Sequence, residues 1–137
     1  MRKTSSLEKQ LGNWLDVSLA SPVPKAVRAF VFCVSPRELA YVLELNGTAE
    51  FSYVSSGWTW SEIWSPDAPK LIILPGDACG RFPEHCRKVR NAIRHYLEAG
   101  VHAHRLTAVE GIAIEALGEG FTLIWTRNLS RQVHIFE

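Results

Sequence analysis

The chain has 137 residues, of which 47% are hydrophobic and 21% are charged. This length and composition predict a single globular domain over residues 1–137, which can bury a sufficient core without disulfides. With 15 Lys and Arg against 14 Asp and Glu, the net charge of +1 excludes the strongly basic field of a nucleic-acid binder. The sequence therefore predicts no nucleic-acid partner.

The N-terminus and the cysteines bear on the cellular location. Charged residues interrupt the first 22 positions, MRKTSSLEKQLGNWLDVSLASP, where a signal peptide needs an unbroken apolar core. No apolar run approaches the roughly 20 residues of a membrane helix. Three cysteines at irregular spacing are typical of reduced thiols. We expect a cytoplasmic protein that does not contact a membrane.

The first third of the chain predicts a helix and then a hairpin. Apolar residues recur at helical spacing over residues 5–19, after a capping box, and Pro22 prevents continuation of the helix. Residues 25–34 and 38–45 are rich in β-branched and aromatic side chains, so they predict two paired strands with a turn at 35–37.

The middle of the chain predicts two further strands and a second helix. The dipeptide Asn46-Gly47 is a turn signal, and a short strand is expected after it at residues 50–54. Residues 70–74 (KLIIL) predict a buried strand. From Pro83 onward, apolar residues recur at three and four positions until Gly100, which suits the C-terminal cap of an amphipathic helix.

The remaining residues complete the expected fold. Residues 111–117 and 121–126 predict a second hairpin around a Gly-Glu-Gly turn, and residues 132–136 could add a terminal strand. Strands and helices do not alternate as they do in a parallel α/β sheet. We therefore expect an α+β fold, with a mostly antiparallel sheet of about five to six strands and the two amphipathic helices packed on one face.

Histidines offer the first candidate chemistry. His102 and His104 would share one face of an extended segment, and His85 precedes Cys86 earlier in the chain. This set suggests an alternative function, a small metal-dependent or thiol hydrolase built on these histidines and a cysteine. Zinc sites normally show two close ligand pairs at a recognisable spacing, which is missing here. We therefore predict no metal and no cofactor.

Other catalytic signatures are not present in the sequence. Cys33 lies in an apolar strand, where a thiol is buried as a small hydrophobe, and Cys79 follows Asp77, whose charge disfavours a thiolate. No Gly-x-Ser-x-Gly elbow, phosphate-binding loop or dinucleotide-binding loop occurs. Because no set of acid and base residues converges, the sequence favours a binding protein over an enzyme.

The second predicted helix carries a run of basic side chains. Arg87, Lys88, Arg90 and Arg94 occupy the face opposite its apolar stripe. No aromatic residues are interleaved with them to form a stacking platform for bases. We interpret this face as a solvated helix surface.

Three of the five tryptophans lie within the seven residues 58–64. On a strand Trp58 and Trp60 would share a face, whereas on a helix Trp60 and Trp64 would meet at a four-residue spacing. Trp58 follows Ser-Ser-Gly, so we expect it to be a surface anchor, while Trp60 and Trp64 suit the core. Together with Tyr53 and Glu62, these three tryptophans form the predicted partner-binding site.

A family resemblance agrees with a binding role. The motifs that carry it are Gly47-Thr48-x-x-Phe51, the tryptophan segment with Glu62 and Trp64, and Tyr96-Leu97 ahead of Gly118-x-Gly120-Phe121. In this order, over residues 23–127, the chain resembles small immunity-type proteins of bacterial polymorphic toxin and contact-dependent inhibition systems. The resemblance implies a small α+β domain that binds a cognate toxin and blocks it, without catalysis of its own.

The chain departs from this family in its charges. Members tend to carry several acidic residues before the tryptophan, whereas here only Glu50 and Glu62 remain, with Ser52, Tyr53 and Ser55 between them. The near-neutral net charge favours a partner gripped by aromatic contacts over one attracted by long-range electrostatics. A homodimer through an exposed sheet edge or helix face is also compatible with the sequence.

Overall fold

The computed structural model describes residues 6–38, 40–55, 57–74, 82–116 and 120–127. These residues form one six-stranded sheet, in which five strands follow the order β3-β2-β1-β5-β6 and β4 also pairs with β2. The strands are β1 (Ala29–Arg37), β2 (Ala40–Thr48), β3 (Glu62–Trp64), β4 (Leu71–Ile73), β5 (Gly111–Ala116) and β6 (Gly120–Thr126). Every pair is antiparallel except β1 with β5. The predicted α+β fold with a mostly antiparallel sheet is confirmed.

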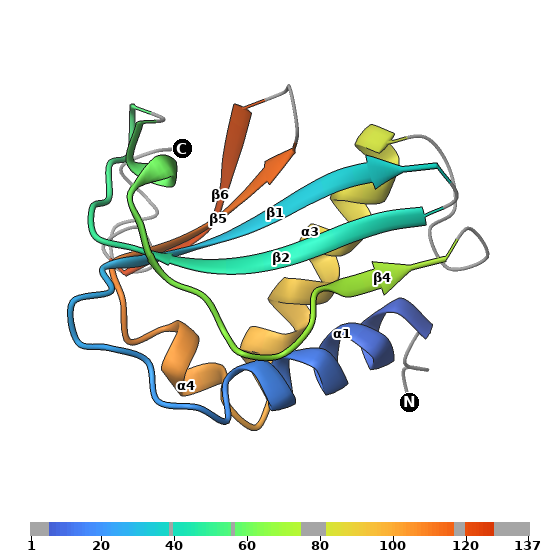
Figure 1. The fold of residues 1–137 in the computed structure, drawn as a ribbon, viewed down its shortest axis with the longest axis horizontal. Coiled ribbons are helices and arrows are strands. Elements are labelled where there is room, and N and C mark those ends of the chain that lie inside the picture. The colour runs from blue at the N-terminus through green and yellow to red at the C-terminus, as the bar shows by residue number, and fades with distance from the viewer. Residues whose placement is uncertain (1–5, 39, 56, 75–81, 117–119, 128–137) are drawn as a thin grey trace.

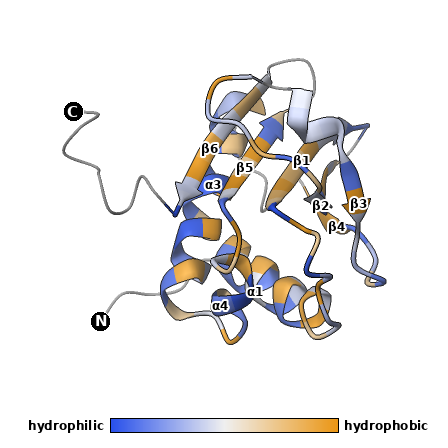
Figure 2. Ribbon diagram, turned by 90° about the vertical axis from the view of Figure 1, so that its left-hand side faces the viewer, coloured by the Kyte–Doolittle hydropathy of each residue, from blue (hydrophilic) through white to orange (hydrophobic). Residues whose placement is uncertain are grey.

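Two long helices, α1 (Ser6–Ser18) and α3 (Phe82–Ala99), pack against one face of the sheet, and the short α4 (Ala103–Leu106) follows α3. In Figure 1, α3 crosses behind β1 and β2, and in Figure 2, α1 and α4 lie below the strands. Both amphipathic helices predicted from the sequence are therefore present. Among the described residues, no helix combines the length and the apolar character needed to span a membrane.

The core lies between this face and the helices. Leu11 and Leu15 of α1, Phe30 and Phe32 of β1, and Ile93 of α3 are all fully buried there. Each such side chain contributes about 1.5–3 kcal/mol by leaving water. The helical spacing in α1 and α3 and the alternation in β1 direct these residues to the same layer.

The loop between β3 and β4 is held to the core by a tryptophan of α1. Trp14 packs edge-on against Phe32 at a centroid distance of 6.3 Å. Its indole Nε1 donates a hydrogen bond of 2.8 Å to the carbonyl oxygen of Pro69. The loop after β3 is thereby attached to α1 and to the core.

The first hairpin lies a few residues further along the chain than predicted. β1 runs to Arg37 and β2 starts at Ala40, so the turn comes after the predicted positions 35–37. Asn46 and Gly47 do not form a turn, because both lie inside β2, where Gly47 pairs with Phe30 of β1. A Cβ on Gly47 would lie 2.9 Å from Val27 Cγ1, so close packing explains this glycine.

Three other local predictions need correction or lie outside the described residues. Residues 50–54 form a loop and no strand, because Phe51 turns onto the sheet face. Residues 101–105, which would place His102 and His104 on one face if they were extended, instead form a turn and the start of α4. The hairpin of β5 and β6 is confirmed, while the expected strand at 132–136 lies outside the described residues.

Gly100 ends α3 as predicted, but for a different reason. Its N–H donates to the carbonyl oxygen of Tyr96 at 2.7 Å, and its φ is not in the left-handed region. A Cβ at this position would overlap the ring of Tyr96. The glycine is therefore needed for the close approach of that ring.

The second face of the sheet, which none of the described α-helices covers, is called here the open face. Its centre consists of the small residues Ala29, Val31 and Ala113. These leave room for Phe51 and Trp58, which the loop between β2 and β3 lays on the sheet. A Cβ on Gly111 would overlap the Phe51 ring, which explains glycine at the start of β5.

Candidate functional site

The tryptophan segment folds as a single 3-10 turn, η1 (Gly57–Trp60), followed at once by β3. A 3-10 helix has three residues per turn, so residues two apart point in different directions. Trp58 is only 3% exposed, whereas Trp60 is 82% exposed. The prediction that Trp58 is the surface anchor was therefore wrong, as was the assignment of Trp60 to the core.

Trp58 is the centre of an aromatic cluster on the open face. Its ring meets Phe51 at 5.0 Å and Phe121 at 5.6 Å, both edge-to-face. Phe51 in turn meets Tyr53 at 5.1 Å. The buried Nε1 of Trp58 has no hydrogen-bond acceptor within the described chain. Trp58 thus fixes the loop by packing.

Hydrogen bonds hold the end of the turn against β2. The carbonyl oxygen of Ser61 accepts a hydrogen bond of 2.9 Å from the N–H of Ala49. The N–H of Ser61 donates to the carbonyl oxygen of Trp58 at 3.0 Å. The Ser61 hydroxyl donates to the same Trp58 oxygen at 2.6 Å. On the other side, the hydroxyl of Thr59 donates to Glu115 Oε2 of β5 at 2.8 Å. The backbone on both sides of Trp60 is therefore anchored.

Four exposed apolar side chains lie on this anchored segment and in the loop just before it. We use the term Trp60 patch for Tyr53 (42% exposed), Val54 (92%), Trp60 and Ile63 (46%). Glu62, between two of them, is also exposed. Trp64 differs, because it packs edge-to-face on Phe30 at 6.0 Å on the helix side of the sheet. Of the predicted binding residues, Tyr53, Trp60 and Glu62 lie at this surface, while Trp58 and Trp64 support it from within.

Carboxylates flank the patch on the open face. Glu44 of β2 and Glu115 of β5 lie on either side of Cys33 in β1, in register with it. Burial, and then the negative charges of Glu115 and Glu44, raise the pKa of the Cys33 thiol to about 12. The Asn46 amide donates to its Sγ at 3.7 Å. Cys33 is therefore a neutral thiol at physiological pH and is not activated as a nucleophile.

The predicted histidine constellation does not assemble. His85 is fully buried in the first turn of α3 and stacks on Tyr41 at 4.0 Å. His102 follows the other end of that helix, about 20 Å away at 1.5 Å per residue. His102 and His104 lie near each other, with ring centroids 6.3 Å apart. Within the described ranges, no three His, Cys, Asp or Glu side chains form a group that could hold a metal.

The cysteines do not complete that constellation either. Cys86 is half-buried and packs against the core from α3. Cys79, the more accessible thiol in the sequence, lies outside the described residues. The hydrolase interpretation therefore loses the convergence of residues on which it depended.

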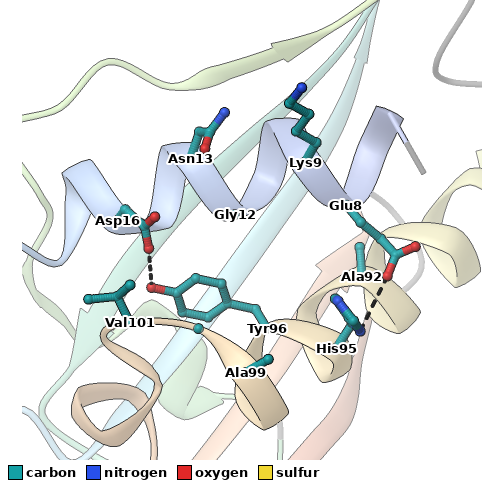
Figure 3. A pocket seen from close by; sticks show the side chains of 11 residues that line it. Glu8, Lys9, Gly12, Asn13, Asp16, Ala92, His95, Tyr96, Ala99 and Val101 are labelled. Atoms are coloured by element: carbon teal, nitrogen blue, oxygen red, sulfur yellow. Dashed lines mark hydrogen bonds and ion pairs between the residues drawn. The ribbon is translucent and has the colours of Figure 1, made fainter. Parts of the chain in front are cut away.

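A groove between α1 and α3 is the other candidate. This cavity of about 210 Å³ contains Asp16, which accepts a hydrogen bond of 2.8 Å from the Tyr96 hydroxyl, and His95, whose Nδ1 lies 3.4 Å from Glu8 Oε2 (Figure 3). Lys9 and Asn13 point away from the Tyr96 ring (Figure 3). Burial raises the pKa of Tyr96 to about 12. Because its acidic groups already bond across the groove, we interpret it as the contact that joins the two helices.

Comparison with known proteins adds no relative. No protein-family model, curated protein sequence or solved structure matches this chain. The chain's own motifs and the Trp60 patch are therefore the features that indicate its function.

Proposed function

We propose that this domain is a protein-binding inhibitor that uses the Trp60 patch to grip its partner. The supporting observation is an indole that is 82% exposed on a turn held from both sides by Ser61 and Thr59. Tryptophan is enriched at the energetic centres of protein interfaces. A side chain on an already ordered backbone also loses less conformational entropy on binding.

Within that class, the function proposed is immunity: the domain binds a cognate bacterial toxin in the cytoplasm and neutralises it. The motifs that resemble immunity-type proteins support this narrower statement, including Gly47-Thr48-x-x-Phe51 and Tyr96-Leu97. The proposed mechanism is steric blockade, with no catalysis and no cofactor. Tyr53, Trp60 and Glu62 contact the toxin, and Val54 and Ile63 extend the apolar contact.

A growth-protection assay tests the proposal. Each candidate toxin encoded beside the gene is expressed in a bacterial host together with wild type, Trp60→Ala or Val101→Ala. Val101 is 70% exposed and lies after α3. Val101→Ala is therefore a control that removes exposed apolar area away from the patch. We expect wild type and Val101→Ala to restore growth, and Trp60→Ala to fail.

Binding measured with purified proteins separates the possible outcomes. Removing an interface tryptophan of this kind costs about 2–4 kcal/mol, or roughly 30-fold to 1000-fold in Kd. Protection by Trp60→Ala equal to wild type would place the toxin contact elsewhere. Failure of wild type to protect against any neighbouring toxin would remove the immunity function itself.

A further inference from the structure

The charges of this protein are unevenly distributed along the chain. Residues 40–67 contain four acidic residues, Glu44, Glu50, Glu62 and Asp67, and no Lys, Arg or His. This segment comprises β2, η1, β3 and the loop that carries the Trp60 patch. The region around the patch is therefore acidic even though the whole chain carries a net charge of only +1.

The fold brings three carboxylates, those of Glu44, Glu62 and Glu115, to the open face near Cys33. Glu62 pairs with Thr48 in the register of β3 and β2, and the Glu50 N–H donates to the Ser61 hydroxyl at 3.2 Å. Glu115 joins them from β5 through its hydrogen bond with Thr59. The charges of Glu44, Glu62 and Glu115 all act on Cys33 in the open face, and the bond of Glu115 to Thr59 places its carboxylate next to the turn that carries Trp60.

Few cations neutralise this group. Lys70 Nζ lies 3.3 Å from Glu44 Oε1. Arg28 Nε pairs with Glu110 Oε2 at 2.5 Å. The bond to Glu110 and then the charge of Glu50 raise the pKa of Arg28, so this arginine partly compensates Glu50. Within the described part of the chain, Glu50, Glu62 and Glu115 form no ion pair. A negative potential therefore remains around the exposed indole, within the roughly 10 Å over which it acts at 0.1 M salt.

Part of the compensating positive charge lies in α3, which packs against the other face of the sheet. Arg87, Lys88, Arg90 and Arg94 all belong to this helix. Because Glu84 and Glu98 also belong to α3, this helix carries a net charge of +2, and the rest of the compensating positive charge lies outside both α3 and residues 40–67. The net charge alone led us to expect a partner bound without electrostatic attraction. That expectation does not consider the local excess of negative charge near the Trp60 patch.

We infer that the Trp60 patch takes a basic protein surface, with an apolar pocket for the indole and lysine or arginine side chains around that pocket. Such cations would pair with Glu62 and Glu115, and one of them could lie over the indole face. Complementary potentials accelerate association and exclude acidic partners. This inference rests on the proposed function, because it specifies the partner of the same surface.

Selection from a random peptide library tests the chemistry of the partner directly. Displayed peptides are selected on the wild-type protein and depleted on Trp60→Ala, at 50 mM salt. We expect the recovered peptides to be enriched in lysine and arginine next to apolar residues. The exposed Trp60 provides the binding signal, because its fluorescence shifts when the indole leaves water.

Charge variants then test the electrostatic part. Glu62→Gln should weaken the selected peptides about threefold or more, whereas Glu98→Gln, the same change at an exposed position of α3, should leave Kd unchanged. Raising the salt from 50 to 500 mM should weaken wild-type binding by about tenfold.

The outcomes distinguish this inference from the proposed function. If the Trp60-dependent peptides lack basic residues, or if their binding does not depend on salt, the inference of a basic partner is wrong, and the Trp60 patch remains a binding site. Failure to recover any Trp60-dependent peptide would overturn both. Salt-sensitive self-association, lost in Arg94→Gln, would show that the basic surface is a second copy of this chain and would overturn a separate basic partner.

Discussion

At the scale of single residues, Trp58 and Trp60 show how two positions in the same short stretch acquire opposite roles. The sequence located the tryptophan segment correctly as an unusual feature. It could not assign the exposed member, because the direction of each side chain depends on whether the backbone is a strand, an α-helix or a 3-10 turn. The turn is in fact stabilised by partners distant in sequence, such as Glu115.

Substitution of these two tryptophans should affect stability very differently. We expect Trp58→Ala to lower the free energy of unfolding by about 3–5 kcal/mol, because it empties the aromatic cluster with Phe51 and Phe121. Trp60→Ala should change it by less than about 0.5 kcal/mol. Urea denaturation followed by circular dichroism measures both. Equal losses would contradict the burial difference between the two side chains.

Alkaline pH should destabilise the protein through Cys33 and Tyr96. Folding raises the pKa of both groups to about 12, from 9.0 for the thiol and 10.0 for the phenol. Folding therefore favours their neutral forms, and this stabilisation is complete below pH 9 and is lost as the pH rises toward 12. We expect the free energy of unfolding to fall over that range, less steeply in Cys33→Ala and in Tyr96→Phe. Parallel curves for wild type and both variants would refute this pH linkage.

At the scale of elements, two glycines near the Tyr96 ring should respond oppositely to alanine. Gly12 lies inside α1, where a Cβ would approach Tyr96 Cδ1 no closer than 3.9 Å. Gly12→Ala should therefore stabilise the protein by about 0.5–1 kcal/mol through helix propensity. Gly100→Ala should destabilise it by about 1–3 kcal/mol, because the new methyl group overlaps the ring.

Thermal denaturation of these two variants provides the measurement. The midpoint should rise for Gly12→Ala and fall for Gly100→Ala. A lower midpoint for both variants would mean that the contact between α1 and α3 leaves no room for a methyl group at position 12.

The elements that the sequence predicted well are those with strong local patterns. The stripes in α1 and α3 and the hairpin of β5 and β6 each depend on the periodicity of neighbouring residues. The errors at Asn46-Gly47 and at residues 50–54 came from tertiary contacts. Val27 requires a glycine at position 47, and Gly111 leaves room for the Phe51 ring. Neither contact can be read from local pattern.

The candidate site was predictable to a similar extent. Of the five predicted binding residues, Tyr53, Trp60 and Glu62 are exposed, although Trp60 was expected to suit the core, whereas Trp58 is buried and Trp64 is half-buried. Glu115 is not among the predicted binding residues, and its position beside Trp60 depends on the pairing of β1 with β5. Because that pairing joins segments far apart in the chain, the sequence contains no local signal for it. The lack of basic residues over positions 40–67 was the signal that could have indicated an acidic surface.

At the scale of the whole molecule, the open face and the helix face share the central strands, so they should unfold together. Tryptophan fluorescence reports on both faces, because Trp58 lies on the first and Trp14 and Trp64 on the second, whereas circular dichroism reports chiefly on the helices. We expect urea transitions followed by tryptophan fluorescence and by far-ultraviolet circular dichroism to coincide, as in a two-state unfolding of a single domain. Two separate midpoints would instead divide the chain into independent cooperative units.

The parallel pairing of β1 with β5 also constrains how the protein is made. Ala29 pairs with Gly111, so β1 has no partner on that edge until β5 is synthesised about 80 residues later. At roughly 5–20 residues per second, translation takes on the order of 4–16 s to supply that neighbour. During this interval the nascent β1–β2 hairpin has one edge open beside β1, where a strand from another chain could pair. The time between the two strands on the ribosome is thus the period in which this protein is most exposed to aggregation.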